Sequence, residues 1–172
     1  PGNALIDDLV LARTGKSFDQ DGQLAAKGRV DKSSLTNFLS HEFFKQPPPK
    51  SLDRNAFDIS VTDRLSLENA AATLVAFTTT AITRSASFFP EPANQWLVTG
   101  GGRHNPMIMK ELFERLGKVV QPVESVGWNG DAIEAEAFAF MAVRSLLKLP
   151  LSFPSTTGVS EAMTGGDLHH PN

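Results

Sequence analysis

The chain has 172 residues, of which 41% are hydrophobic and 20% are charged, so it is long enough and apolar enough for one domain with a core. Its net charge of -3 argues against a nucleic acid or an anionic membrane surface as the main partner, and the absence of cysteine excludes disulfides and cysteine-based metal sites. We find neither a signal peptide nor an apolar run approaching the roughly 20 residues that cross a bilayer, and we expect a cytoplasmic protein.

Two helices are predicted in the first third of the chain. Residues 5–13 have helical spacing and end at Thr14 and Gly15, a typical left-handed helix stop. Residues 16–29 combine glycines with mixed charge, which predicts a surface loop with one short helical turn. Residues 34–45 predict an amphipathic helix, which ends before three prolines because proline lacks an amide donor.

The longest helix is expected over residues 65–88, with Asp63 as its N-cap. Its many alanines and threonines indicate tight packing against neighbouring helices. Pro90 and Pro92 then prevent the helix from continuing.

The second half predicts a strand, a helix, a second strand and a final helix. The strands are expected at residues 96–99 and 118–120, with a helix over residues 106–116 between them, so they form a parallel pair with a right-handed crossover. Two strands make a poor sheet, and we expect an uncovered sheet edge and an exposed apolar face. The final helix, residues 132–147, is apolar on nearly every side, which predicts a central, buried position.

Three glycines, Gly100, Gly101 and Gly102, lie between the first strand and the helix that follows it. Glycines there let the backbone approach a flat or anionic ligand and direct the amides of the helix start toward it. Asn105 is predicted to cap that helix. A plain strand-to-helix turn is the alternative, and the spacing matches neither a P-loop nor a dinucleotide-binding fingerprint.

Gly2 and Asn3 directly precede the first predicted helix. A helix start of this kind is suited to holding a phosphate, because its first amide groups lack partners within the helix. The alternative is a frayed chain terminus. For Asp7 and Asp8 in the following turns, we expect mainly a favourable interaction with the helix dipole.

Two acids, Glu134 and Glu136, lie near the start of the last predicted helix. They are about 200° apart around the helix axis, so they cannot face the same site. Because an unpaired buried carboxylate is costly, at least one of them is expected to face a polar cleft. A structural ion pair with Arg144 or Lys148 is the alternative for Glu134. Asp131 is expected to be the N-cap of this helix.

Several segments, in this order, resemble the C-terminal half of anhydro-N-acetylmuramic acid kinases, sugar kinases of the actin, hexokinase and Hsp70 superfamily. They are residues 1–8 (PGNALIDD), 18–22 (FDQDG), 48–54 (PPKSLDR), 98–105 (VTGGGRHN), 130–140 (GDAIEAEAFAF), 149–158 (LPLSFPSTTG) and 165–166 (GG). Each segment is weak alone, but their order makes the resemblance specific.

The resemblance implies a single domain over residues 1–172: the C-terminal half of an actin-like, ribonuclease H-like ATPase domain. This α/β fold would be helix-dominated, with a small, mainly parallel sheet. ATP with Mg²⁺ is the implied cofactor, and an anhydro-sugar is the implied substrate. The implied site residues are Gly2 and Asn3 for the phosphates, Gly100, Gly101, Gly102 and Asn105 for the adenosine side, and Glu134, within Glu-Ala-x-Ala-Phe-Ala, for the sugar.

Members of this family are about twice as long, and their general-base aspartate stands three residues before the proline of Pro-Gly-Asn. This chain begins at that proline, so we expect the second half of a kinase, without its general base and inactive alone. The parent would phosphorylate the 6-position of 1,6-anhydro-N-acetylmuramic acid while water opens the anhydro ring, giving N-acetylmuramic acid 6-phosphate in cell-wall recycling.

Two alternatives remain open: a non-catalytic nucleotide-binding or regulatory domain of the same superfamily, and a helical scaffold without a ligand. We expect no nucleic-acid or membrane partner, and the sequence leaves a homodimer open. We also expect no protein-held metal site, because the adjacent His169 and His170 cannot easily chelate one ion.

Overall fold

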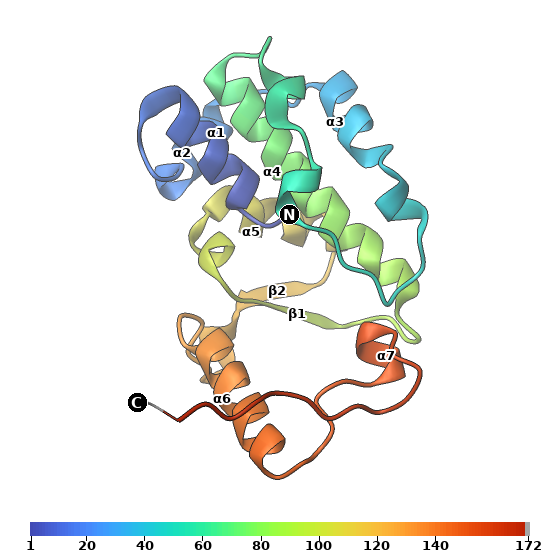
Figure 1. Cartoon of the computed structure of the whole chain (residues 1–172). Helices are drawn as coiled ribbons and strands as arrows, with labels where there is room; N and C mark the ends of the chain where they lie inside the picture. Colours follow the sequence, from blue (N-terminus) through green and yellow to red (C-terminus); the bar gives the residue numbers. More distant parts are fainter. Residues whose placement is uncertain (171–172) are drawn as a thin grey trace.

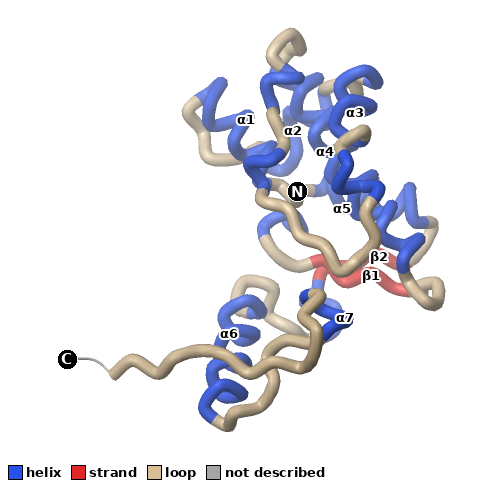
Figure 2. The backbone as a smooth tube through the Cα atoms, turned by 45° about the vertical axis from the view of Figure 1, so that its right-hand side comes forward, coloured by secondary structure: helices blue, strands red, loops and turns tan. Residues whose placement is uncertain are grey.

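A computed structural model describes residues 1–170 and contains a helical layer, a small sheet and a second, thinner helical layer. The helices are α1 (Ala4–Thr14), α2 (Gln23–Lys27), α3 (Lys32–Leu39), α4 (Leu67–Arg84), α5 (Pro106–Leu116), α6 (Ile133–Leu146) and α7 (Pro154–Thr157). The strands are β1 (Gln95–Val98) and β2 (Val119–Pro122). Figures 1 and 2 show α1 to α5 on one side of the strands and α6 and α7 on the other. The predicted helix-dominated α/β fold is confirmed.

Helix α4 forms the centre of the main core. Every residue from 70 to 79 is buried, and α1, α2, α3 and α5 surround the helix (Figure 1). Small side chains allow this close approach, as predicted. Gly28 at the end of α2 shows how tight the packing is, because a Cβ there would overlap the backbone carbonyl of Glu68.

The ends of α4 differ from the prediction. Ser66 caps the helix by accepting the amide of Asn69, whereas Asp63 forms an ion pair with Arg13 at 3.4 Å. The predicted N-cap was therefore wrong, because Asp63 ends the preceding 3-10 turn with helical backbone angles, whereas Ser66 has the extended backbone of a cap. At the other end α4 stops at Arg84, and a short 3-10 turn, Ser85–Phe88, completes the predicted length.

The first helices follow the prediction in part. Helix α1 ends at Gly15, whose φ of 74° gives the predicted left-handed stop. The stretch 16–29 contains the short helix α2. Helix α3 ends at Leu39, earlier than predicted, because His41 has an extended backbone and its Nδ1 accepts the amide of Phe43. A separate 3-10 turn follows at Glu42–Lys45.

The strands form the predicted parallel pair, connected through α5. Gln95 pairs with Val119 and Val98 with Pro122. Helix α5 has the predicted bounds, and it buries Ile108 and Leu112 against the main core. This crossover places the turn between β1 and α5 beside the start of α1.

Helix α6 does not occupy the buried position that its apolar sequence predicted. None of its residues is buried, and Phe138, Phe140 and Leu146 are 64%, 63% and 61% exposed. A helix that is apolar on nearly every side needs partners on several sides, and the described residues supply too few of them. The expected exposed apolar face is thus present on α6. Neither α6 nor any other helix within residues 1–170 is long and apolar enough to cross a membrane.

Candidate functional site

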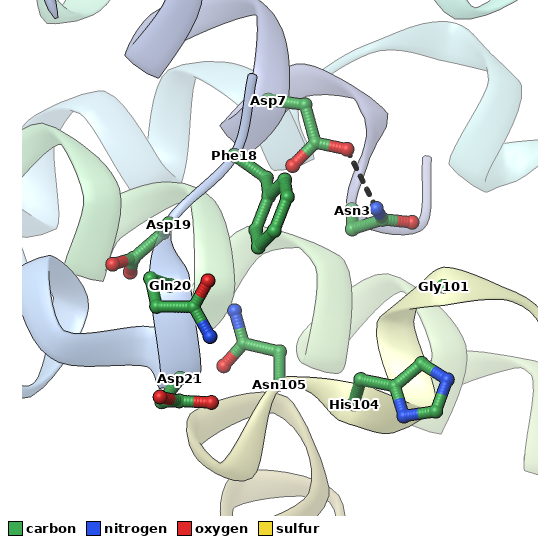
Figure 3. A pocket seen from close by; sticks show the side chains of 9 residues that line it. All are labelled: Asn3, Asp7, Phe18, Asp19, Gln20, Asp21, Gly101, His104 and Asn105. Carbon is green, nitrogen blue, oxygen red and sulfur yellow. Dashed lines mark hydrogen bonds between the residues drawn. The ribbon is translucent and has the colours of Figure 1, made fainter. Parts of the chain in front are cut away.

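A cavity of about 500 Å³ lies between the start of α1, the loop after it and the glycine turn after β1 (Figure 3). The three segments are far apart in the sequence, and the fold brings them together. The cavity is lined by Asn3, Asp7, Phe18, Asp19, Gln20, Asp21, Gly101, His104 and Asn105.

The start of α1 has no side-chain cap. Asn3 occupies the N-cap position, but its side chain is directed along the helix and donates from Nδ2 to Asp7 Oδ2 at 2.6 Å (Figure 3). The first amide groups of a helix lack partners within the helix, and the dipole makes this end attractive to anions. The start of α1 is therefore suited to a phosphate.

The glycine turn lies directly against this helix start. A Cβ on Gly101 would be 3.3 Å from Asn3 Nδ2, and one on Gly102 would be 3.8 Å from Asn3 Oδ1. Gly100, before them, has a φ of 72°, which favours glycine. The turn thus has a left-handed backbone at Gly100 and lies close to Asn3 at Gly101. Both features favour glycine and suit a backbone that contacts a ligand.

Asn105 caps α5, as predicted. Its Oδ1 accepts the amides of Met107 at 3.0 Å and Ile108 at 3.4 Å. These amides are therefore already bonded, so the start of α5 does not offer them to a ligand as the sequence suggested. The amide nitrogen of Asn105 points instead toward the ring of Phe18 in the cavity (Figure 3).

Three acids line the cavity, and they differ in their roles. Asp19 accepts the amides of Leu24 at 2.8 Å and Ala25 at 3.1 Å, so its carboxylate holds the start of α2. Asp21 is exposed and has a φ of 54°. Burial raises the pKa of Asp7, and the hydrogen bond from Asn3 opposes that rise. Of the three, Asp7 is the carboxylate nearest the uncapped helix start.

The residues present fit a nucleotide that carries Mg²⁺ better than a bare polyphosphate. The cavity lining contains Asp7, Asp19 and Asp21 but no lysine or arginine, so a free polyanion would meet repulsion. Carboxylate oxygens are ligands that Mg²⁺ accepts, usually together with phosphates and water. Within residues 1–170 no group of three acidic or histidine side chains could hold a metal ion by itself.

Three predicted binding glycines, Gly2, Gly100 and Gly102, lie outside the cavity lining but next to it. Gly2 has a φ of 66°, and its carbonyl accepts the hydroxyl of Thr78 at 2.7 Å, which ties the helix start to α4. The carbonyl of Gly100 accepts Nη1 of Arg103 at 3.0 Å. Ligand binding by these three glycines stays a prediction.

Glu134 is not brought to the cavity. It is exposed on α6, on the other side of the strands. The alternative ion pair does not form among the described residues either, because Arg144 donates to the carbonyl of Pro150 at 2.8 Å and Lys148 forms no ion pair there. Its role as the sugar-side acid stays a prediction.

Asp131 was expected to cap α6, and this was wrong. The cap position is Ala132, and Asp131 instead accepts Nη2 of Arg103 at 2.7 Å. The guanidinium of Arg103 also holds the pKa of Asp131 below its ordinary value. No role was predicted for Arg103, whose acceptors Glu124 and Asp131 lie far from it in the sequence.

The wall formed by Phe18, Gln20 and Asp21 was not predicted either. The segment 18–22 belongs to the family resemblance, but the glycines and mixed charge of residues 16–29 predict a surface loop. The available signal was the glycine that ends it. Gly22 has a φ of 65°, and a Cβ there would be 2.6 Å from Asn105 Oδ1, so the loop turns back against the glycine-turn side of the cavity.

The helix-dominated fold with its small parallel sheet, and the cavity between a helix start and a glycine turn, agree with the expected half of an actin-like ATPase domain. The chain belongs to the anhydro-N-acetylmuramic acid kinase family, whose sequence model matches residues 1–171.

Proteins named anhydro-N-acetylmuramic acid kinase are similar along nearly the whole chain. The one from Rhodospirillum rubrum is 52% identical over 96% of this chain and 44% of its own length. Those from Paramagnetospirillum magneticum and Brucella anthropi are each 51% identical, over 99% and 98% of this chain and 49% and 45% of their own lengths. The chain thus spans about half the length of the curated relatives it matches.

Proposed function

We propose that the chain is the nucleotide-binding, C-terminal half of a two-domain sugar kinase. The full-length protein would use ATP to convert 1,6-anhydro-N-acetylmuramic acid to N-acetylmuramic acid 6-phosphate, a step of peptidoglycan recycling. Family membership supports the reaction class. The observation that carries the assignment to this half is the cavity in which Gly101 lies against Asn3 at the uncapped start of α1.

In this proposal the cavity holds the nucleotide through backbone and amide groups. The amides at the start of α1, with Gly2 and Asn3, bind phosphate oxygens. Gly100 to Gly102 allow the ligand to lie against the backbone beside the adenosine. Asn105 uses its oxygen for the helix cap and keeps its amide nitrogen as a donor to the ligand.

Bound Mg²⁺ would neutralise phosphate charge, which suits a cavity whose side chains are acidic. Asp7 is the residue of this chain best placed to contribute a carboxylate or to bind a metal-bound water. Its raised pKa shows that burial disfavours its charged form, so a cation nearby would stabilise that form.

The chemistry requires attack by water on the anomeric carbon of the anhydro-sugar. The bond from that carbon to O6 breaks, water loses a proton to a base, and O6 takes the γ-phosphoryl group as ADP leaves. The base would be the aspartate that the family resemblance places upstream of Pro1. Glu134 would hydrogen-bond the sugar, and the enzyme would contribute mainly positioning and charge stabilisation.

The test is an assay of the full-length protein with Mg²⁺, ATP and the anhydro-sugar, with ADP release and the phosphorus spectrum of the product followed together. We expect one ADP per sugar consumed and one phosphate monoester at carbon 6. Omission of the anhydro-sugar is the control. ATP binding without any sugar-dependent ADP release would contradict the kinase and favour a non-catalytic nucleotide-binding domain.

A further inference from the structure

Arg103 connects the glycine turn to the loop that leads into α6. Its side chain is only 3% exposed, although it carries a charge. Nε donates to Glu124 Oε1 at 2.9 Å, Nη2 to Asp131 Oδ1 at 2.7 Å, and Nη1 to the carbonyl of Gly100 at 3.0 Å. Each guanidinium nitrogen therefore has its own acceptor, one of them within the glycine turn and two in the segment before α6.

The segment before α6 is shaped around this guanidinium. A Cβ on Gly130 would lie 2.5 Å from Arg103 Nε and 2.7 Å from Glu124 Oε1, so only glycine fits without displacing the cluster. The amide of Gly130 donates to the same Glu124 oxygen at 3.2 Å. The hydroxyl of Thr99, at the end of β1, donates to the carbonyl of Gly130 at 3.2 Å.

These polar contacts hold a helix that has little packing of its own. Within residues 1–170, α6 buries no side chain, so the hydrophobic effect does little to set its position. The cluster of Arg103, Glu124, Gly130 and Asp131 lies immediately before its first turn. Glu134 stands in that turn, three residues after Asp131.

We propose that Arg103 is a positioning residue that fixes the start of α6, with Glu134, relative to the nucleotide-binding glycine turn. This inference rests on the proposed function, because it names the two sides of the cleft as the nucleotide side and the sugar side. Nucleotide bound at Gly100 to Gly102 then affects the start of α6 through the Arg103 side chain.

The geometry requires an arginine at this position. Its planar fork presents donors in several fixed directions, whereas a lysine ammonium is a point charge on a flexible stem. A lysine at position 103 would keep the charge and reach one acceptor at a time. Arg103→Lys therefore tests whether the positive charge is enough or whether the three separate hydrogen bonds are needed.

The experiment compares full-length wild-type protein with Arg103→Lys by hydrogen–deuterium exchange and steady-state kinetics. In the wild type, adding Mg²⁺ and ATP should protect the amides of residues 100–105 and also those of residues 128–136. In Arg103→Lys, protection should remain at 100–105 and be lost at 128–136. Turnover should fall about tenfold or more, while the Kd for ATP changes by less than about threefold.

Two further variants make the test specific. Asp131→Ala removes one acceptor whose side chain is 79% exposed, so it leaves the folded core intact and should give part of the same effect. Because Arg103 acts in part through Asp131, the double variant that combines Arg103→Lys with Asp131→Ala should lose no more turnover than Arg103→Lys alone. Arg115→Lys is the matched control, since Arg115 pairs with Glu111 on the surface of α5 at 2.8 Å and should leave all readouts unchanged.

Several results would overturn the inference. These are unchanged protection at 128–136 in Arg103→Lys, additive losses in the double variant, or a lower melting temperature with normal turnover per folded molecule. Failure of the proposed function looks different, because the wild type would then show no sugar-dependent turnover while the ATP-dependent exchange pattern could still be compared. Normal wild-type turnover with an unaffected Arg103→Lys variant would contradict this inference and leave the proposed function unchanged.

Discussion

Gly101 lies against the side-chain amide of Asn3, so close that a Cβ on Gly101 would be 3.3 Å from Asn3 Nδ2. The two residues are near opposite ends of the sequence that forms the main core, and α4 and α5 bring them together. This contact forms one wall of the cavity to which we assign the nucleotide (Figure 3).

The first prediction follows from this contact. Gly101→Val should weaken ATP binding by the full-length protein by an order of magnitude or more. The added side chain would displace Asn3 and would keep the ligand away from the backbone of the glycine turn. The melting temperature should change little, since Gly101 is exposed. Calorimetric titration with Mg²⁺ and ATP measures the effect. Gly165→Val, remote from the cavity, is the control. Equal ATP affinities of the two variants would mean that Gly100, Gly101 and Gly102 form only a turn.

Local signals predicted α5 to the residue, whereas tertiary contacts decided other features. Asn105, Pro106 and Gly117 act through short-range backbone geometry, so the helix bounds could be read directly. The N-cap of α4 could not, because Asp63 and Ser66 are both suitable cap residues, and the choice depends on the 3-10 turn that ends at Asp63 and leaves it with helical backbone angles. Burial of α6 depends on partners that sequence periodicity does not reveal.

The candidate site, too, could be predicted only where it depends on local sequence patterns. The sequence indicated Gly101 and Asn3 separately, because glycine-rich turns and helix starts have recognisable patterns. The contact between Gly101 and Asn3 depends on the tertiary fold, and so does the position of Phe18 in the same cavity. Local sequence patterns do not specify either. Arg103 was missed because its acceptors lie in a segment more than one element away, and no spacing rule connects them.

A second prediction concerns the two acids of α6. Glu134→Gln in the full-length protein should lower turnover roughly ten- to a hundredfold, as expected for the loss of a charge-assisted hydrogen bond of about 1.5–3 kcal/mol to the reacting sugar. ATP affinity should be nearly unchanged. Glu136→Gln is the matched control, since Glu136 lies on the other side of the helix and should have a far smaller effect. Similar losses in both variants would show that Glu134 does not face the sugar.

A third prediction concerns this 172-residue chain by itself. It should show no sugar-dependent ADP release, because the base and the opposite wall of the cleft would be supplied by the other half of the kinase. The control is the full-length protein at the same active-site concentration. Measurable conversion of anhydro-sugar by the purified chain would contradict the division of the site between two halves.

The exposed face of α6 leads to a fourth prediction. Phe138, Phe140 and Leu146 expose a large apolar surface, which favours self-association of the isolated chain. Replacing Phe138 and Leu146 together by serine should shift the isolated chain toward monomer in sedimentation velocity. The same change should lower the stability of the full-length protein if the other half covers α6. An isolated chain that is monomeric at all concentrations would contradict this prediction.

The last prediction uses the titration of Asp7. Burial raises its pKa above the ordinary 3.8, so the folded protein binds this proton more tightly than the unfolded chain. The stabilisation is fully present below pH 3.8 and is lost as the pH rises through the folded-state pKa, above which the ionised carboxylate destabilises the fold. Asp7→Asn removes the titration and can still accept the amide of Asn3.

Thermal unfolding should therefore show Asp7→Asn melting above the wild type at pH 7, with the advantage shrinking as the pH is lowered toward 3.8. Asp58→Asn is the control with the opposite sign, because hydrogen bonds from Ser60 lower the pKa of Asp58 and its ionised form stabilises the fold. In the full-length protein Mg²⁺ with ATP should stabilise the wild type more than Asp7→Asn, since the cation relieves the cost of the charge at Asp7. If Asp7→Asn melts lower at pH 7 and gains as much from the nucleotide, the carboxylate is structural and does not face the bound metal.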